Sequence, residues 1–363
     1  MEYKRLGDYI RLVDVRNRDL KVTNLLGVSI SKEFMPSIAN TIGTDMSVYK
    51  IVERGQFAYG PVTSRNGDKV SIALLNDYDN AIISQAYTVF EVIDHNALSP
   101  EYLMMWFKRP EFDRYARFHS HGSAREIFDW NELCDVLLPI PSIEEQRRIV
   151  SEYQTVEQHI QNNEQLIKKL EETAQAIYHH TFVEGIDEEN LPKGWRKGML
   201  SDIVTFKVGG DKPKIFSETI SNECRYPIYS NGTENKGLYG YTNKPSITTN
   251  SITISARGNV GTCFLRRHPY SGIVRLVSVL PCQEELLYYL YFDLLSRNLQ
   301  GDGSAQQQIT VPQLENENII IPSSNVLNKF HNQMEILFNN IDNIEKETQY
   351  LNSLLSLLTS KLS

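Results

Sequence analysis

Residues 122–142, GSAREIFDWNELCDVLLPIPS, return in altered form 181 positions later as residues 303–323, GSAQQQITVPQLENENIIIPS. The Gly-Ser-Ala triplet, one leucine (Leu133 and Leu314) and the Ile-Pro-Ser triplet recur at that spacing without a gap. A repeat at a fixed offset indicates that one structural unit has been built twice. We therefore expect the fold to have internal pseudo-twofold symmetry.

A long heptad pattern of mostly apolar residues follows each Ile-Pro-Ser triplet. The first pattern consists of Ile149, Tyr153, Val156, Ile160, Asn163, Ile167, Leu170, Ala174 and Ile177. The second consists of Phe330, Met334, Leu337, Ile341, Ile344, Thr348, Leu351, Leu355, Leu358 and Leu362. Alternating steps of four and three place these residues on one stripe of a helix, with a period that suits supercoiling. Because residues 144–182 contain no Gly or Pro, the first helix is predicted to be about 58 Å long at about 1.5 Å per residue.

Each stripe has three candidate partners: its own globular neighbour, the same stripe of a second chain, or the other stripe. Two equally long stripes in one chain, separated by a folded segment of about 140 residues, can cover each other. The duplication therefore favours an intramolecular antiparallel pair. Asn163 and Thr348 interrupt the stripes, one on each helix, and are candidates for fixing the register at some cost in stability.

The composition is that of a soluble protein with several parts. The 363 residues, 41% of them hydrophobic, allow two globular domains with cores of their own in addition to the helices. No apolar run approaches the roughly 18 residues that cross a bilayer, and residues 1–15 are charged throughout, so we expect a cytoplasmic location. Cys134, Cys224, Cys263 and Cys282 lie far apart, which favours buried free thiols over a zinc site or disulfides.

The net charge of −8 conceals a strong regional contrast. Residues 142–190 hold 4 Lys and Arg against 11 Asp and Glu, whereas residues 191–283 hold 13 against 5. Residues 1–141 are near balance at 16 against 19, although Lys108, Arg109, Arg114, Arg117 and Arg125 crowd together beside two histidines. A basic globule on an acidic helix suggests that the second globule binds a polyanion.

Both globular segments are predicted to mix strands and helices in the same order. In the first, residues 49–55, 70–75 and 81–92 have strand-like patterns, and residues 100–117 have helical spacing of aromatic and Met residues. In the second, residues 251–255, 261–266 and 273–280 are strand-like and residues 284–299 are helix-like. The pattern predicts an α+β fold: two mixed α/β domains joined by two long antiparallel coiled-coil helices.

Residues 137–150, LLPIPSIEEQRRIV, combine a hydrophobic strand, a Pro-x-x-x-Glu-Gln turn and the start of the first long helix. With residues 122–124, 84–90 (SQAYTVF) and 256–261 (ARGNVG), this segment resembles the specificity subunits of type I restriction-modification systems. The resemblance covers the whole chain in architecture, but the second helix follows Pro322 with SSNVLNKF and lacks the Glu-Gln pair of Glu145 and Gln146.

The resemblance implies two target-recognition domains, residues 1–141 and 191–322, and two conserved spacer helices, residues 142–190 and 323–363. It implies binding of double-stranded DNA, and partners in the form of two modification (methyltransferase) subunits and a motor-nuclease restriction subunit. S-adenosylmethionine, ATP and Mg are expected on those partners and no cofactor on this chain. Glu145, Gln146 and Arg147 are the candidates for subunit binding.

Two reading domains at the ends of an antiparallel helical pair would hold their half-sites at a fixed gap, so the helices would act as a ruler. Because the two domains differ in sequence, the target is expected to be asymmetric and bipartite. Side chains with donors for bases and phosphates in loops are the candidate contacts. They are Arg65, Lys69, Arg117, His119, His121 and Arg125 in the first domain, and Lys212, Lys214, Asn231, Lys236, Arg257, Arg266 and Arg267 in the second.

No catalytic motif is present in the sequence. There is no G-x-G-x-x-G after a strand, no Walker loop, no H-E-x-x-H and no Asn-Pro-Pro-aromatic segment, and the His179-His180 pair lacks a third metal ligand nearby. We therefore predict a non-catalytic subunit without a metal site. The alternatives are a diverged nuclease or transferase, a coiled-coil scaffold that does not read DNA, and the specificity subunit of a related type IIB-like system.

Overall fold

The computed structural model describes residues 3–37, 43–64, 67, 69–122, 126–297, 299 and 308–362. The chain forms two compact units: unit 1 comprises Met1–Glu164 and Lys346–Ser363, and unit 2 comprises Gln165–Glu345. Each unit therefore holds one globular segment and part of both long helices, whereas the sequence predicts the helices as segments of their own. Of the Gly-Ser-Ala triplets, only Gly122 lies within the described residues.

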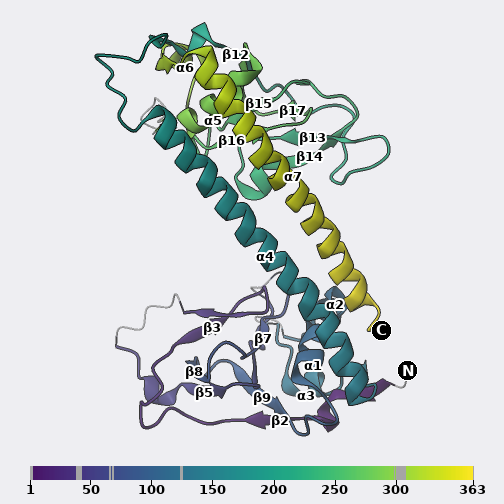
Figure 1. Cartoon of the computed structure of the whole chain (residues 1–363). Helices are drawn as coiled ribbons and strands as arrows, with labels where there is room; N and C mark the ends of the chain where they lie inside the picture. The colour runs from purple at the N-terminus through teal and green to yellow at the C-terminus, as the bar shows by residue number, and fades with distance from the viewer. Residues whose placement is uncertain are drawn as a thin grey trace. The chain divides into compact units, whose positions relative to one another are not determined.

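The two heptad patterns form the helices α4 (Ile143–Phe182) and α7 (Ser324–Ser360). In unit 1, Val150 and Tyr153 of α4 share a core cluster with Leu362 beyond the end of α7. In unit 2, Phe182 of α4 packs edge-on against Phe330 of α7, with ring centroids 4.9 Å apart. The start of each helix thus packs with the end of the other, which confirms the predicted antiparallel pairing (Figure 1).

The apolar stripes explain why these helices pair. Every residue of both heptad patterns is buried or half-buried, including the polar Asn163 and Thr348. Parts of the stripes also cover the unit's own globular core: in unit 2 the stripe residues Ala174 and Met334 belong to the same buried cluster as Leu290 and Phe292 of the globular segment. Two of the candidate partners for each stripe, the other stripe and the globular neighbour, are therefore both used.

Within the described residues, unit 1 contains the 3-10 helices Leu6–Asp8 and Met46–Val48 and, besides its parts of α4 and α7, ten strands and three short α-helices. They are β1 (Tyr3–Arg5), β2 (Ile10–Val13), β3 (Leu26–Val28), β4 (Phe34–Pro36), β5 (Lys50–Glu53), β6 (Phe57–Tyr59), β7 (Ile72–Leu74), β8 (Asn80–Ile83), β9 (Thr88–Val92), α1 (Pro100–Phe107), α2 (Pro110–Phe118), α3 (Trp130–Cys134) and β10 (Leu137–Pro139).

Among the residues that the structure describes, unit 2 contains the 3-10 helices Leu200–Asp202, Glu234–Gly237 and Glu284–Leu286, and nine strands and two short α-helices. They are β11 (Arg196–Met199), β12 (Val204–Val208), β13 (Tyr226–Tyr229), β14 (Leu238–Thr242), β15 (Ser251–Ile254), β16 (Cys263–Arg266), β17 (Ser271–Gly272), β18 (Val277–Pro281), α5 (Leu287–Ser296), α6 (Val311–Glu315) and β19 (Asn318–Ile321).

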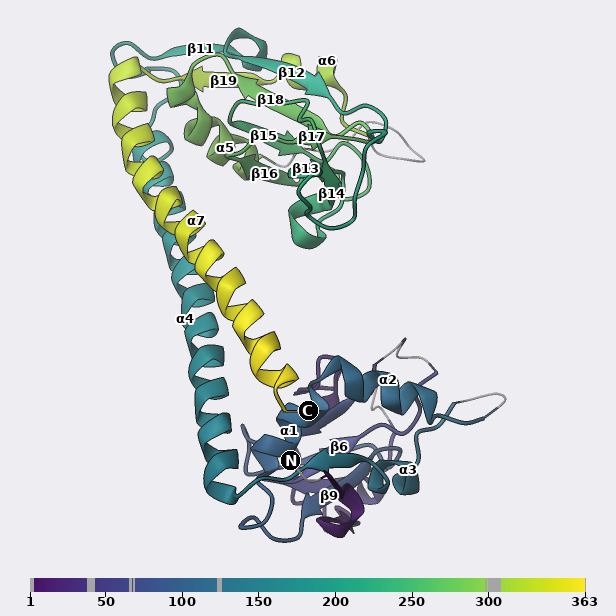
Figure 2. The same cartoon turned by 90° about the vertical axis from the view of Figure 1, so that its right-hand side faces the viewer.

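The central sheets of the two units have the same topology. The strand order is β2-β9-β6-β7 in unit 1 and β12-β18-β15-β16 in unit 2, and every neighbouring pair is antiparallel. Figure 2 shows the sheet of unit 2, with β18 and β15 between β12 and β16. In both units the first strand pairs with the last: β1 with β10, and β11 with β19. The two units therefore have the same fold, as the sequence repeat predicts.

Three predicted elements are broken in the structure, each for a local reason. The run 81–92 forms two strands, β8 and β9, because a turn at residues 84–87 separates them. The helical run 100–117 is divided into α1 and α2 because Pro110 begins a new helix and Arg109 before it is extended. The run 273–280 becomes a strand only at Val277, because Val274 and Arg275 have positive φ.

A dense aromatic core lies under the sheet of unit 1. Phe57 and Phe90 stack with their centroids 4.8 Å apart, and Phe107 of α1 meets both rings edge-on.

Three of the four cysteines are buried as expected, whereas Cys282 is exposed. Among the helices described, none is long and apolar enough to cross a membrane.

Candidate nucleic-acid interface

Asn231 holds three loops of unit 2 together. It follows β13, and its Nδ2 donates to the carbonyl oxygen of Val274 over 2.7 Å. Its Oδ1 accepts from the amide of Ala256 over 2.8 Å, and its carbonyl oxygen accepts from the hydroxyl of Ser255. Because both ends of the amide are occupied, Asn231 positions these loops, and its predicted role as a direct reader of bases is not supported by this geometry.

Exposed cations lie on and beside the loops that Asn231 joins. Arg257 follows Ala256 and donates from Nε to Gln308 Oε1 over 3.1 Å. Lys212, after β12, lies with its Nζ 3.4 Å from the ring centroid of Phe216. Lys214 is exposed and makes no hydrogen bond or ion pair with any residue that the structure describes. The charge of Lys214 and Arg257 therefore remains available to a polyanion.

Arg266 does not belong to this surface, and its assignment as a DNA contact is wrong. The residue is 1% exposed, and its guanidinium lies 3.5 Å from the ring centroid of Tyr229. Nε donates to Thr253 Oγ1 over 3.0 Å and Nη2 to the carbonyl oxygen of Lys236 over 2.6 Å. Burial lowers the pKa of its guanidinium. The alternation of β16 points this side chain into the domain.

Arg267 points the other way and binds the helix α7. Its guanidinium forms ion pairs with Glu335 at 2.8 Å and Asp342 at 2.6 Å, and its side chain is only 11% exposed. Lys236 forms a third pair with Glu345 of α7 at 2.7 Å. These cations are paired with acidic residues inside unit 2, so the geometry does not support Arg267 as a DNA contact, and the charge of Lys236 is partly neutralised.

The candidates in unit 1 are largely paired with acidic residues. Arg117 forms an ion pair with Glu126, and His119 Nδ1 lies 3.0 Å from Glu132 Oε2 while its ring stacks on Tyr115. His121 Nε2 lies 3.6 Å from Glu132 Oε1. Lys69 is exposed, and Arg65 and Arg125 lie outside the described residues.

The basic residues expected to cluster in residues 108–125 are likewise paired with acidic residues or buried. Lys108 pairs with Glu157 of α4 at 2.6 Å, and Arg114 pairs with Glu111 at 2.9 Å. Arg109 is buried, with its guanidinium 4.2 Å from the ring centroid of Trp106. Within the described part of unit 1, these residues therefore do not form a continuous positive surface.

Gln146, a predicted subunit contact, is fully buried instead. Its Oε1 accepts from the amide of Ser99 over 2.8 Å, and its Nε2 donates to the carbonyl oxygens of Ala97 and Pro141 over 3.0 and 2.9 Å. It therefore fastens the start of α4 to the loop before α1 and cannot reach a partner. At the position 181 residues later, unit 2 has Leu327, which is 3% exposed, so an apolar contact replaces the amide.

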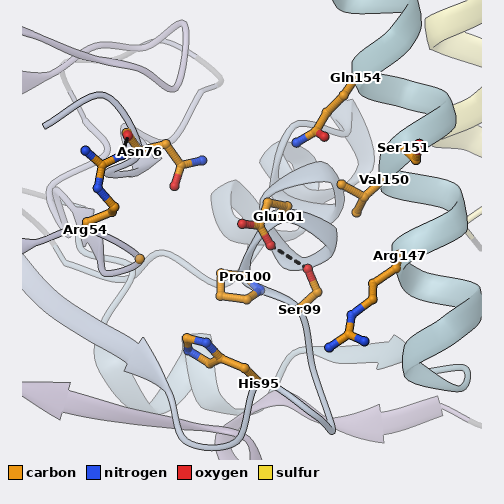
Figure 3. A pocket seen from close by; sticks show the side chains of 11 residues that line it. Arg54, Asn76, His95, Ser99, Pro100, Glu101, Arg147, Val150, Ser151 and Gln154 are labelled. Carbon is orange, nitrogen blue, oxygen red and sulfur yellow. Dashed lines mark hydrogen bonds between the residues drawn. The ribbon is translucent and has the colours of Figure 1, made fainter. Parts of the chain in front are cut away.

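Arg147 remains accessible, on the wall of a cavity of about 530 Å³ in unit 1. Figure 3 shows Arg147, Val150, Ser151 and Gln154 of α4 on one side and Arg54, Asn76 and His95 on the other. Arg147 makes no hydrogen bond or ion pair with a described residue, whereas Glu145 is paired with Arg148 at 2.6 Å. Of the three predicted subunit contacts, Arg147 is the one whose charge is free.

Across the residues described, no three His, Cys, Asp or Glu side chains come together as they would around a metal ion. In the His179-His180 pair, His180 Nδ1 lies 2.9 Å from Glu184 Oε2, which is one turn further along the chain.

Comparison with known proteins gives a family match over both halves of the chain. The family described as type I restriction modification DNA specificity domain matches residues 3–172 and again residues 192–355. The Mycoplasma pneumoniae protein "Putative type I specificity subunit S.MpnORF89P" is 34% identical over 136 residues, which are 38% of this chain and 39% of that protein. A second protein of that organism, S.MpnORF507P, is 28% identical over 60% of this chain and 57% of its own length. The chain thus spans about two fifths to just under three fifths of the length of these relatives.

The fold also matches a solved structure. The S subunit of a type I restriction-modification system from M. genitalium superposes with a TM-score of 0.61 and 16% identity, and the match covers 99% of this chain and 95% of that one. At this identity the likeness concerns the fold.

Proposed function

Because this chain belongs to the family of type I restriction modification DNA specificity domains, we propose that it is the non-catalytic subunit that selects the DNA target of a type I restriction-modification complex. The observation that carries the proposal is the double match: the family describes each globular segment together with the long helix that follows it. Both units also have the same strand order, so each has the framework of a reading domain.

The surface of unit 2 supports contact with a polyanion. Lys214 and Arg257 are exposed on turn-rich loops, and Asn231 joins the Arg257 loop to a third loop at residues 273–276. Phosphates attract such cations without regard to sequence, whereas donors that reach base edges distinguish one sequence from another. In unit 1, the described candidates are Lys69, Arg117, His119 and His121, supplemented by Arg65 and Arg125.

The target is asymmetric and bipartite in this proposal. Unit 1 and unit 2 have different loops on the same sheet framework, so they select different half-sites. The paired helices α4 and α7, which contain no glycine or proline between Ile143 and Phe182 or between Ser324 and Ser360, act as the ruler that fixes the gap.

The chemistry belongs to partner subunits. Two modification subunits that carry S-adenosylmethionine and one motor-nuclease subunit that uses ATP and Mg complete the complex, in the cytoplasm of a prokaryotic cell. Arg147 and the cavity that it lines are the proposed contact for a modification subunit, because its guanidinium is unpaired among the described residues.

Selection of DNA by the assembled complex tests the function. The full chain, purified with its modification subunits, is incubated with a library of random duplexes, and bound DNA is sequenced. We expect one motif made of two unlike parts with a constant gap. A contiguous motif would contradict the ruler, and the absence of any enriched sequence would favour the scaffold that does not read DNA.

Charge variants separate DNA contact from a general loss of charge. Replacing Lys214 and Arg257 together by Ala should weaken binding by about tenfold or more and reduce its dependence on salt. The matched control replaces Lys168 and Lys169, two exposed cations of the acidic helix α4, and should leave binding within about twofold. Equal effects of the two pairs would contradict the assignment of the surface.

A further inference from the structure

Two consecutive residues of unit 2, Val274 and Arg275, adopt left-handed backbone conformations, with φ of +52° and +61°. This region disfavours residues with a Cβ, and β-branched residues most of all. Val274 is the one β-branched residue with positive φ among the residues described. Glycine would adopt the same turn without strain, so the presence of valine and arginine has to be explained by their side chains.

The turn is held firmly by its surroundings. The amides of Val274 and Arg275 donate to the carbonyl oxygens of Gly210 and Gly209 over 3.0 Å each, and the carbonyl oxygen of Val274 accepts from Asn231. A Cβ on Gly209 would lie 2.7 Å from the backbone of Gly272, so the two chains can approach only because that position is glycine. The surrounding structure therefore imposes the strained conformation.

Neither strained side chain contributes to the packing of unit 2. Val274 is 55% exposed. Arg275 is exposed too, and its guanidinium makes no hydrogen bond or ion pair with any described residue, in contrast to Arg266 and Arg267. An apolar side chain and an unpaired guanidinium thus project together from a rigid tip.

The tip belongs to the cationic loops of the proposed interface. Asn231 links it directly to the loop of Arg257, since one side-chain amide bonds both Val274 and Ala256. Arg257 is also exposed. A DNA backbone lying on this surface would therefore pass the Val274–Arg275 turn and meet the positive charge of Arg257 on the adjacent loop.

We propose that the Val274–Arg275 turn is the element of unit 2 that enters a groove of the DNA, with Arg275 donating to base edges and Val274 making the apolar contact beside it. The inference rests on the proposed function and names residues that determine its specificity. A guanidinium with its planar fork binds guanine through two hydrogen bonds, and an apolar side chain contacts a thymine methyl group or a base step. A fixed backbone keeps this pair in register with the bases.

Two substitutions test the turn in the full chain assembled with its modification subunits. Arg275→Lys retains the positive charge but loses the planar guanidinium that can donate two parallel hydrogen bonds to guanine. Binding to mixed-sequence duplexes should therefore stay within about twofold. Preference at one position of one half-site should disappear, and affinity for the selected site should fall roughly 5- to 150-fold. Val274→Gly relieves the strain and removes the apolar contact. It should leave the Tm unchanged or higher while affinity for the selected site falls severalfold.

The controls are exposed residues of unit 2 outside this turn and without positive φ, Arg225→Lys and Ile220→Ala, which should select the wild-type motif with unchanged affinity. Random duplexes are the probe in every arm. If the unsubstituted complex enriches no motif, the proposed function fails and this inference falls with it. If it enriches a motif that Arg275→Lys and Val274→Gly both retain at wild-type affinity, the inference alone is overturned.

Discussion

Asn163 of α4 is hydrogen-bonded to Thr348 of α7, with its Nδ2 3.3 Å from Thr348 Oγ1 and 3.0 Å from Glu347 Oε2. Asn163 is 5% exposed, so this is a polar contact inside an apolar seam. The positions 181 residues away are Ile344 and Ile167, which are both apolar. The two halves of the helical pair are therefore distinguishable, and the polar half fixes which residues lie opposite each other.

Replacing Asn163 and Thr348 together by Ile should stabilise the chain, because it places at both positions the residue that the repeat has at Ile344 and Ile167 and extends the apolar seam. A gain of about 1 kcal/mol would raise the Tm by about 2 to 4 °C, measured by circular dichroism. Asn162→Ile, on the exposed face beside Asn163, is the control and should not raise it. A decrease for the double variant would show that the polar pair is needed for stability and not for register.

Gln146→Ala should lower the free energy of unfolding by about 3 kcal/mol, because the amide of Ser99 and the carbonyl oxygens of Ala97 and Pro141 lose their partner at a buried position. Gln146→Leu, which copies Leu327 of unit 2, should be no better, since it supplies no hydrogen bond. Urea unfolding measures both. The adjacent exposed Arg147→Ala should change stability by less than about 0.5 kcal/mol, and similar losses at the two positions would contradict this assignment.

Arg266→Ala should destabilise unit 2 by about 3 kcal/mol or more, because a large buried side chain is replaced by a cavity and two hydrogen bonds are lost. Exposed Arg257→Ala should cost less than about 0.5 kcal/mol while weakening DNA binding. Denaturant unfolding and duplex titration of both variants distinguish the two roles. A fully stable Arg266→Ala variant that fails to bind DNA would restore Arg266 as a contact.

His268 should make unit 2 less stable in mild acid. Burial, followed by the positive charges of Arg266 and Lys236, lowers the pKa of His268, whose Nε2 lies 2.9 Å from the hydroxyl of Tyr229. Below a pH of about 6.5 the unfolded chain binds a proton that the folded chain does not, so stability falls as the pH falls through that range.

Unfolding in urea between pH 7.5 and 5 measures this effect, and His268→Gln should reduce the slope relative to the wild type. An unaltered slope in His268→Gln would assign the pH dependence to other groups.

The helices could be predicted from sequence because their signal is local and long. The steps of four and three connect nine stripe residues between Ile149 and Ile177 and ten between Phe330 and Leu362, and no Gly or Pro interrupts either run. The sheets were predicted less well. Residues 81–92 are uniformly strand-like, and the turn at 84–87 that divides them depends on pairing with strands elsewhere in the unit.

The sequence contains a second, shorter repeat at a different spacing. Residues 5–10, RLGDYI, correspond to residues 199–204, MLSDIV, and both segments lead through a short helical turn with a buried leucine into the first strand of the central sheet. Its offset of 194 differs from 181, so a search at one fixed spacing could not find it.

The candidate site was predicted as a region and not as residues. The charge count identified residues 191–283 as basic, but it could not tell which of their cations form ion pairs inside unit 2. Arg267 forms ion pairs with Glu335 and Asp342, which lie 68 and 75 residues further along the chain, and pairs so distant leave no local pattern in the sequence. Arg275 was overlooked because its positive φ, and hence its exposure, follows from the fold around Gly209 and Asn231.

The pairing of first and last strands in each unit has an evolutionary consequence. Since β1 lies beside β10 and β11 beside β19, the chain enters and leaves each sheet framework at neighbouring points. The residues between those paired strands form a segment whose two ends lie side by side. A gene could acquire a new segment of this kind by two crossovers that leave the coding sequence of the helices intact. Such an exchange would change one half of the bipartite DNA target that we propose for the protein.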